Sequence, residues 1–193
     1  MNQDLNKIET TIFKLLSVGL VLFYILSATL LPAATEFHRG VYVFITYVLV
    51  FLLYKSPYPF LRPLDYLLIG LSILCVSYWI VNYEALNYRA GAETLLDKTI
   101  AVAGVLLGIE VARRVIGPIF VILSGLLLVY GVYGMYFPNL IAHPGASFPE
   151  LCTTIFYKED GVFGIMANVL ATYVVLFVIF GAFMERSGAQ RFF

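Results

Sequence analysis

Residues Gly161–Met184 read GVFGIMANVLATYVVLFVIFGAFM, which is twenty-four consecutive residues without a charge. The hydrocarbon core of a bilayer is about 30 Å thick, and a helix needs about 20 mostly apolar residues to cross it. The stretch shows no alternation of apolar and polar residues with a period of two, so it predicts a helix and not a strand. It therefore indicates a membrane-spanning helix.

Five further apolar runs lie between the charged residues upstream of this segment. They are Leu15–Leu31, Gly40–Tyr54, Tyr66–Tyr83, Thr99–Ile109 and Gly117–Phe137. The fourth run has only eleven residues and spans only if its helix continues past Glu110, over Thr99–Ala112. Because helices satisfy every backbone group in lipid, we expect an all-α integral membrane protein with about six transmembrane helices, or five if Thr99–Ala112 does not span.

Composition and charge support the same class. The chain is 61% hydrophobic and 12% charged and has no net charge, whereas a soluble domain carries about 25% charged residues. This excludes a basic nucleic-acid binder and an acidic disordered tail. With six spans, eight Lys and Arg residues lie on the N-terminal side and four on the other, so the positive-inside rule predicts that the N-terminus and the C-terminus are cytoplasmic. Trp79, Tyr83 and Tyr88 cluster at the end of the third run, as membrane-interface residues do.

The start of the chain allows a second interpretation. Lys7 and Lys14 ahead of an apolar run are also typical of a cleaved signal peptide. The run has seventeen residues, however, and Pro32 stands where a small residue is wanted, which favours an uncleaved first span.

Residues that carry chemistry are sparse. Cys75 and Cys152 form no C-x-x-C pair, and His38 and His143 have no second histidine beside them. Nucleophilic catalysis needs a nucleophile within reach of a base, and the sequence proposes no such pair. The ionisable residues lie at the edges of the runs, so no proton relay is indicated. We therefore expect no enzyme, no catalytic residue, no cofactor and no metal site.

The densest charge group is Glu110, Arg113 and Arg114. The spacings of three and four residues place these side chains on one helical face, where they can pair. The group is either a stop signal at the cytoplasmic interface or a structural junction that ties the fourth and fifth spans together. Just before it, Gly104 and Gly108 form a G-x-x-x-G pattern, which predicts a close helix contact.

The longest connection between spans covers residues 138–160. It contains His143-Pro144-Gly145, a pattern typical of a turn. The following Glu150–Tyr157 has apolar positions that predict a short helix lying on the membrane.

Several segments of the second half occur in a familiar order. They are Arg113-Arg114-Val-Ile-Gly117-Pro118, Tyr130-Gly-Val-Tyr-Gly134, His143-Pro-Gly, Glu159-Asp-Gly161-Val-Phe-Gly164 and the stretch from Ala171 to Gly188. This order resembles the N-terminal part of the fused permease (4TM/12TM type) of tripartite ATP-independent periplasmic (TRAP) transporters, in the branch that works with TAXI-type binding proteins. The resemblance covers about residues 99–193, and residues 1–98 match only by helix pattern.

The resemblance implies a membrane component of a secondary, sodium-coupled importer of organic acids in a bacterial or archaeal cytoplasmic (inner) membrane. Residues 1–112 would form a small-subunit-like four-helix scaffold. Residues 113–193 would begin the large permease domain, with a connecting helix, an outer loop at 138–160 and a helix at 161–184. The implied partners are the lipid bilayer, the remaining large-subunit helices and a periplasmic TAXI-type substrate-binding protein, without nucleic acid.

The sequence departs from the family pattern because it stops at Phe193, before the hairpins that hold sodium and substrate in such permeases. We therefore expect either a fragment or a natural split subunit, with sodium bound only by the complete transporter. No substrate-binding residue can be carried over. Structural roles alone are carried over: Glu110, Arg113 and Arg114 as junction candidates, and His143, Pro144, Gly145, Gly161 and Gly164 as candidates for docking on the outer side. The alternative is an adaptor that binds a partner helix bundle without transport.

Overall fold

Helices end close to the prolines, glycines and charges that separate the apolar runs. The computed structural model describes residues 7–30, 34–55 and 62–188. Within these ranges every regular element is helical. The elements are α1 (Lys7–Thr29), α2 (Thr35–Leu53), α3 (Arg62–Val81), α4 (Tyr83–Tyr88), α5 (Leu95–Val115), α6 (Pro118–Tyr133), the 3-10 turn η2 (Gly134–Tyr136), α7 (Phe148–Tyr157), α8 (Ile165–Val169), the π-helical segment η3 (Leu170–Val174) and α9 (Val175–Arg186).

Among the residues that the structure describes, five helical segments are long and apolar enough to cross a membrane, as expected of a multi-pass membrane protein. They are Lys7–Ser27, Thr35–Leu53, Arg62–Val81, Pro118–Tyr136 and Ile165–Arg186. Helix α5 is continuous over 21 residues, but charged residues near both of its ends keep it out of this set. The all-helical class is thus confirmed, with five spans identified by length and composition.

The helices extend beyond the charge-free runs that indicated them. Helix α1 begins at Lys7, well before Leu15, and α2 begins at Thr35 and takes in Arg39. Long basic side chains at helix ends can keep their charges in water or in ion pairs, so charges near an end do not stop a helix. The last span behaves in the opposite way. Its helix starts at Ile165, after the turn that contains Gly161.

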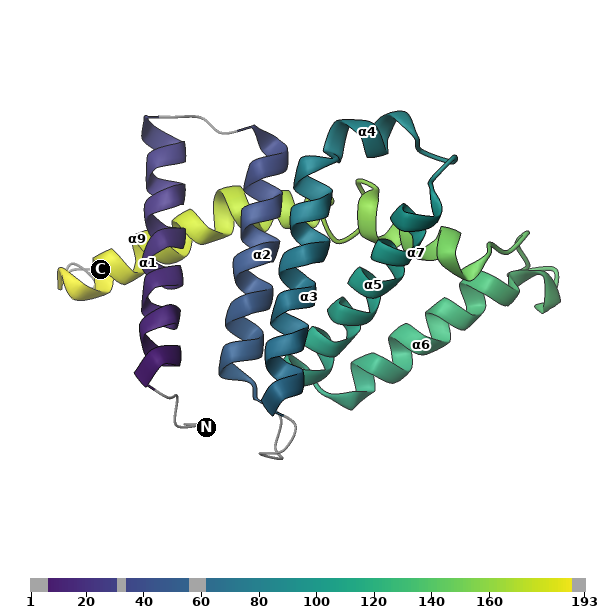
Figure 1. The fold of residues 1–193 in the computed structure, drawn as a ribbon, viewed down its shortest axis with the longest axis horizontal. Coiled ribbons are helices and arrows are strands. Elements are labelled where there is room, and N and C mark those ends of the chain that lie inside the picture. The colour runs from purple at the N-terminus through teal and green to yellow at the C-terminus, as the bar shows by residue number, and fades with distance from the viewer. Residues whose placement is uncertain (1–6, 31–33, 56–61, 189–193) are drawn as a thin grey trace.

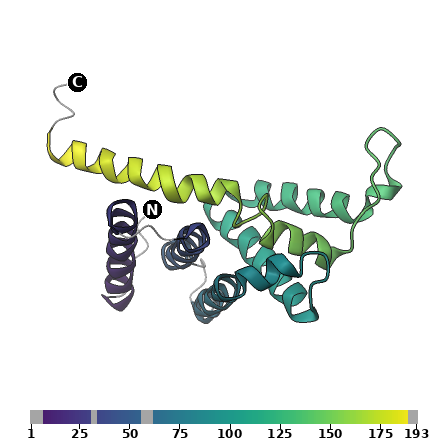
Figure 2. The same ribbon diagram turned by 90° about the horizontal axis from the view of Figure 1, so that it is seen from above.

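Helices α1, α2 and α3 stand side by side as one layer (Figure 1), and the view from above shows them end-on in a row (Figure 2). Helix α5 packs on α3 and α2, and α7 packs along α5. Lipid is as apolar as a leucine side chain, so these helices associate through close packing and polar bonds and gain little from the hydrophobic effect.

The hydrophobic core lies where α2, α3, α5 and α7 meet. The largest side chains buried there are Phe51, Trp79, Leu107, Phe156 and Phe163. The short helix at Phe148–Tyr157 confirms the expected helical segment, but α7 does not merely lie on a membrane surface. Its Phe156 side chain is fully buried against α5, so α7 is part of the core.

The last helix runs across the layer instead of along it. In Figure 1 the helix α8–η3–α9 passes behind α2 and α1 at mid-height, and Figure 2 shows it lying along one side of the layer. Contacts of α8 and η3 with α2, and of α9 with α1, hold it there.

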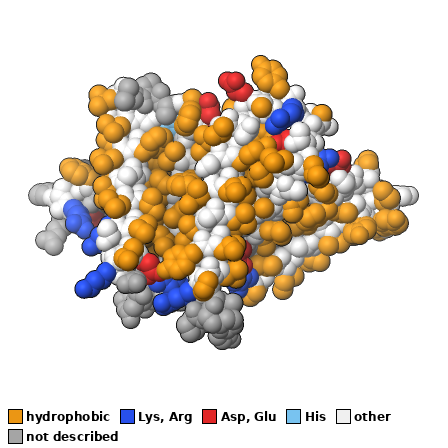
Figure 3. Space-filling model, in the orientation of Figure 1, with side chains coloured by type: hydrophobic (Ala, Val, Ile, Leu, Met, Phe, Trp, Pro, Cys, Tyr) orange, Lys and Arg blue, Asp and Glu red, His pale blue; other side chains and the backbone are white. Residues whose placement is uncertain are grey.

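Apolar side chains cover the face of the layer seen in Figure 3, while Lys and Arg lie at its margins, several of them along the lower edge. We call the end of the layer where Lys55, Arg62, Arg113 and Arg114 lie the basic end. At this end α2 and α5 finish and α1 and α3 begin (Figure 1).

Candidate functional site

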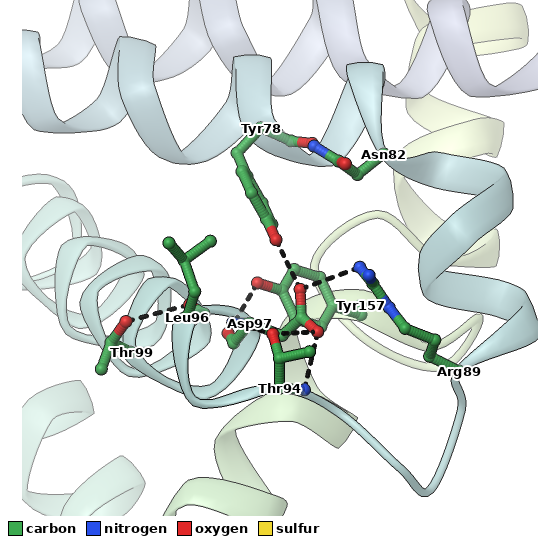
Figure 4. Close-up of polar contacts among 8 residues, drawn as sticks. All are labelled: Tyr78, Asn82, Arg89, Thr94, Leu96, Asp97, Thr99 and Tyr157. Atoms are coloured by element: carbon green, nitrogen blue, oxygen red, sulfur yellow. Dashed lines mark hydrogen bonds and ion pairs between the residues drawn. The ribbon is translucent and has the colours of Figure 1, made fainter.

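A dense polar group is centred on Asp97, in the first turn of α5 (Figure 4). The Tyr78 hydroxyl donates to Asp97 Oδ1 at 2.5 Å, and Arg89 Nη2 lies 3.2 Å from the same oxygen. The backbone N–H and the hydroxyl of Thr94 both donate to Asp97 Oδ2, each at 2.8 Å. The carboxylate itself is completely buried.

The same residue also fixes the start of α5. Thr94 and Asp97 form a reciprocal capping box, in which the Asp97 N–H donates to Thr94 Oγ1 at 3.2 Å. From α7, the hydroxyl of Tyr157 donates to the Asp97 backbone carbonyl at 2.8 Å. Asp97, on α5, therefore bonds to α3, to α7 and to the connection between α4 and α5.

The electrostatics of this group favour a structural role. Burial alone would raise the pKa of Asp97, but hydrogen bonds from Tyr78 and Thr94 and the charge of Arg89 hold that pKa below its ordinary value. Burial raises the pKa of Tyr157, so this phenol stays protonated and can donate. The Asp97 oxygens accept four bonds, about as many as a carboxylate can, which leaves no acceptor for a metal or a substrate.

The structure brings the three junction candidates together at the basic end. Arg113 donates to both Glu110 oxygens at 2.7 Å, and Arg114 Nε donates to Glu110 Oε1 at 2.7 Å. Arg114 also reaches Asp65 Oδ1 at 2.7 Å and the Tyr54 carbonyl at 2.8 Å. These bonds link α5 to α3 and to the end of α2. The sequence had instead predicted a junction between α5 and the following span, α6.

The two arginines differ in their surroundings. The Arg114 side chain is 6% exposed and lies over the ring of Phe51, with 4.9 Å from guanidinium to centroid. The Arg113 side chain is 50% exposed and pairs with Glu110 on its own helix. Arg114 is thus the residue that connects the helices.

A second polar group at the basic end connects the first three helices. Lys55, just after α2, donates to Glu9 Oε2 of α1 at 2.5 Å, and the Tyr66 hydroxyl of α3 donates to Glu9 Oε1 at 2.9 Å. The Lys55 and Glu9 side chains are both almost fully buried. Two charges removed from water in this way stabilise the fold only while they remain paired.

Among the outer-side candidates, His143 packs on the end of α6. Its Nε2 lies 3.1 Å from the Tyr130 carbonyl, and the Gly145 N–H donates to its Nδ1 at 3.1 Å. Both partners are satisfied only by a neutral ring with the proton on Nε2. Pro144 is exposed between them. His143 therefore holds its own turn closed, and its ring nitrogens are both occupied.

At each of the three candidate glycines, neighbouring backbone atoms leave no room for a Cβ. Gly145 has φ of +74°, and a Cβ there would lie 2.7 Å from the Val132 carbonyl oxygen. A Cβ on Gly161 would lie 2.0 Å from the Ile155 oxygen, and one on Gly164 would lie 2.0 Å from the Glu159 oxygen. Gly161 and Gly164 shape the turn after α7, while His143 and Gly145 shape the turn after α6.

The G-x-x-x-G pair of α5 makes close contacts, as expected, with two different elements. A Cβ on Gly104 would lie 2.2 Å from the Phe156 ring of α7. A Cβ on Gly108 would lie 3.1 Å from the Tyr47 hydroxyl of α2. Beside this contact, a groove of about 420 Å³ opens between α5, α6 and α7. Its lining is mainly apolar and includes Val105, Phe120, Leu127, Leu151 and Ile155.

Metal-ligating residues do not converge in the described parts of the chain. Within residues 7–30, 34–55 and 62–188, no three His, Cys, Asp or Glu side chains lie close enough to hold a metal ion. Cys75 and Cys152 are buried, unbridged core residues.

In the described ranges, three buried carboxylates were not expected from the sequence: Glu9, Asp65 and Asp97. The sequence from Thr94 to Asp97 carries a capping-box pattern, which would have placed Asp97 at a helix start. No local pattern marks Glu9 or Asp65, because their partners lie 46 and 49 residues away along the chain, at Lys55 and Arg114.

Neither a protein-family model, nor a curated protein, nor a solved structure matches this chain.

Proposed function

We propose that this chain is a scaffold component of a secondary transporter of the TRAP type, in a bacterial or archaeal cytoplasmic membrane. In this role it holds the moving, substrate-carrying helices of a sodium-driven importer of organic acids in place. It carries out no chemistry itself. Both the N-terminus and the C-terminus are cytoplasmic in this proposal, and Thr99–Ala112 within α5 forms a sixth span.

The observation that carries the scaffold proposal is the placement of the buried ion pairs. Glu9 with Lys55, and Arg114 with Asp65 and Glu110, tie α1, α2, α3 and α5 together at one end. At the other end of α5, Asp97 bonds to α3 and receives a bond from α7. A part that others move against must keep its own helices fixed, and buried charge pairs are costly to break.

Two helices contrast with this fixed unit. Helix α6 has no buried residue, and neither does α9. Helix α6 and the part of α9 before Glu185 are apolar on every side, which in a membrane leaves their surfaces for lipid or for further helices. This arrangement fits a component that presents helices to a larger assembly, and it fits the resemblance on which the transporter class rests.

Transport assays test the proposal. The chain would be reconstituted in liposomes alone, and together with the large permease helices and the TAXI-type binding protein of its own genome. We expect uptake of labelled organic acid only in the full set, and only with an inward sodium gradient. Uptake by residues 1–193 alone would overturn the proposal. So would uptake by the other components that is unchanged without this chain.

The sixth span has its own test. Two single-cysteine variants are needed, Glu93→Cys just before α5 and Val115→Cys at its last residue. In sealed vesicles, a membrane-impermeant maleimide should label these two positions from opposite sides. Labelling of both from the same side would limit the chain to spans other than α5.

A further inference from the structure

The helix from Ile165 to Arg186 is apolar and long enough to span a membrane, but it lies across the other helices instead of parallel to them. Its 22 residues are the most apolar of the five candidate spans. Yet this helix lies across the layer, with α8 and η3 against α2 and α9 against α1, and the end of α9 lies level with the middle of α1 (Figure 1). If α1–α3 cross the bilayer, the end of α9 lies at the depth of the hydrocarbon.

That position is unfavourable for the end of a helix. Helix α9 closes with Glu185 and Arg186, and charged side chains inside a membrane are costly. The last carbonyls of a helix also have no partner within the helix, and hydrocarbon offers them none. The apolar body of α9 is stable in lipid, but its end favours the membrane surface.

The beginning of the same helix is firmly held. The Phe163 ring stacks on Trp79 of α3, and Arg39 of α2 donates to the Phe163 carbonyl at 3.2 Å. Ala167 and Ala171 are buried against the layer. From Val175 onward no residue of α9 is buried. The boundary between the part with buried residues and the part that contacts α1 without a buried residue therefore falls at η3.

The backbone changes its hydrogen-bond register at the same place. The Val175 N–H donates to the Leu170 carbonyl, five residues back, as in a π-helix. One turn earlier, the Thr172 hydroxyl donates to the Asn168 carbonyl at 2.7 Å. Side-chain bonds of this kind bend helices, and π-helical turns occur where a helix carries an extra residue that can shift its register.

We propose that η3 is a hinge on which α9 moves between the crosswise position and a membrane-spanning position. In the spanning position, to which the proposed cytoplasmic C-terminus applies, the charged end of α9 reaches the membrane surface, while Phe163 and Ala167 stay on the layer. The hinge goes beyond the scaffold role and does not depend on the transporter class.

Distance measurements by pulsed electron paramagnetic resonance test the hinge in the full chain in lipid nanodiscs. Spin labels would be attached to cysteines replacing Ser187, at the end of α9, and Tyr88, which is 92% exposed on α4. Cys75 and Cys152 are buried and should remain unlabelled. We expect two distance populations, because the end of α9 moves by roughly 15 Å along the membrane normal, half the thickness of the hydrocarbon core, between the two positions. A single narrow population would overturn the proposal.

Two controls locate the motion. Labels on Val115→Cys, at the end of α5, and Tyr88→Cys, on α4, both lie outside the last helix and should give one distance. Deletion of Val174 removes one residue from η3 and should restore a continuous α-helix, which collapses the Ser187–Tyr88 distances to one population. Two populations that persist in the deletion variant, with Trp79 emission unchanged as evidence of folding, would place the flexibility elsewhere and overturn the hinge.

Discussion

The rings of Trp79 and Phe163 stack face to face, with centroids 3.9 Å apart and planes inclined by 6°. Trp79 belongs to α3, and Phe163 lies in the turn before α8, so the contact fastens the last helix to the layer. Both side chains are 1% exposed. Trp79 is also the single tryptophan of the chain, which makes this contact directly observable by fluorescence.

Replacement of Phe163 by alanine should release the last helix from the layer. We expect a loss of about 3–5 kcal/mol in the free energy of unfolding, since a large buried ring leaves a cavity. The Trp79 emission should change at the same time, because its stacking partner is gone. Phe177→Ala is the matched control, since Phe177 is 70% exposed on α9. Equal effects of the two substitutions would contradict the assigned role of Phe163.

Gly104 should not tolerate a methyl group. Its Cβ would overlap the buried Phe156 ring, so Gly104→Ala should destabilise the protein by about 1–3 kcal/mol, the usual cost of overpacking. Gly125→Ala is the control, because nothing lies within 4 Å of a Cβ at Gly125. Thermal unfolding in detergent, followed by circular dichroism, measures both.

A second substitution checks the cause of that effect. Adding Phe156→Val to Gly104→Ala should cost less than the sum of the two single changes, because the smaller side chain makes room for the methyl group. Additive losses would show that Phe156 is not what excludes a side chain at Gly104.

The helical class could be predicted because it depends only on local composition. Runs such as Gly161–Met184 are long and free of charges, which predicts helices with the composition of membrane spans. The orientation of that last helix could not be predicted, because an apolar helix has no face that marks its neighbours. Trp79 shows the same limit. Its place near a helix end predicted a membrane interface, but the ring is buried in the core on Phe163.

Among the charged groups, pairs within one helix could be predicted from the sequence, and pairs between helices could not. The bonding of Glu110 to Arg113 and Arg114 followed from spacing, since all three lie within one turn or so of a helix. The Asp65 partner of Arg114 lies on another helix and left no pattern in the sequence. The same distinction applies to Gly104. Gly104 signalled a close contact, but the sequence did not say that α7 would provide it.

Substitution of the neighbouring Arg113 and Arg114 should lower the free energy of unfolding by very different amounts. Arg114→Gln takes the guanidinium charge away from the buried Asp65 carboxylate, so we expect a loss of about 3–5 kcal/mol in the free energy of unfolding. Arg113→Gln removes a half-exposed pair within one helix and should cost about 0.2–1 kcal/mol. Unfolding by SDS titration in mixed micelles compares them. Similar losses for the two variants would mean that Arg114 does not connect the helices.

Asp97→Asn should weaken the junction of α3, α5 and α7 while keeping the shape of the side chain. An amide offers one acceptor oxygen where the carboxylate takes bonds on both, and it has no charge for Arg89. Hydrogen bonds to charged groups contribute about 1.5–3 kcal/mol each, so we expect a loss of about 2–4 kcal/mol at pH 7. Glu84→Gln, on an exposed carboxylate of α4, is the control and should have little effect.

The Asp97→Asn variant should also reveal how acid acts on the wild-type protein. The pKa of Asp97 is lower in the folded protein than its ordinary value of 3.8, so below about pH 4 the unfolded chain binds the proton more readily. The stability that Asp97 contributes is therefore complete above that range and is lost as the pH falls through the folded pKa. The amide of the variant binds no proton, so the difference in stability between wild type and variant should shrink between about pH 5 and about pH 3. Thermal unfolding at each pH measures this, and a difference that stays constant would show that Asp97 is not held by charge.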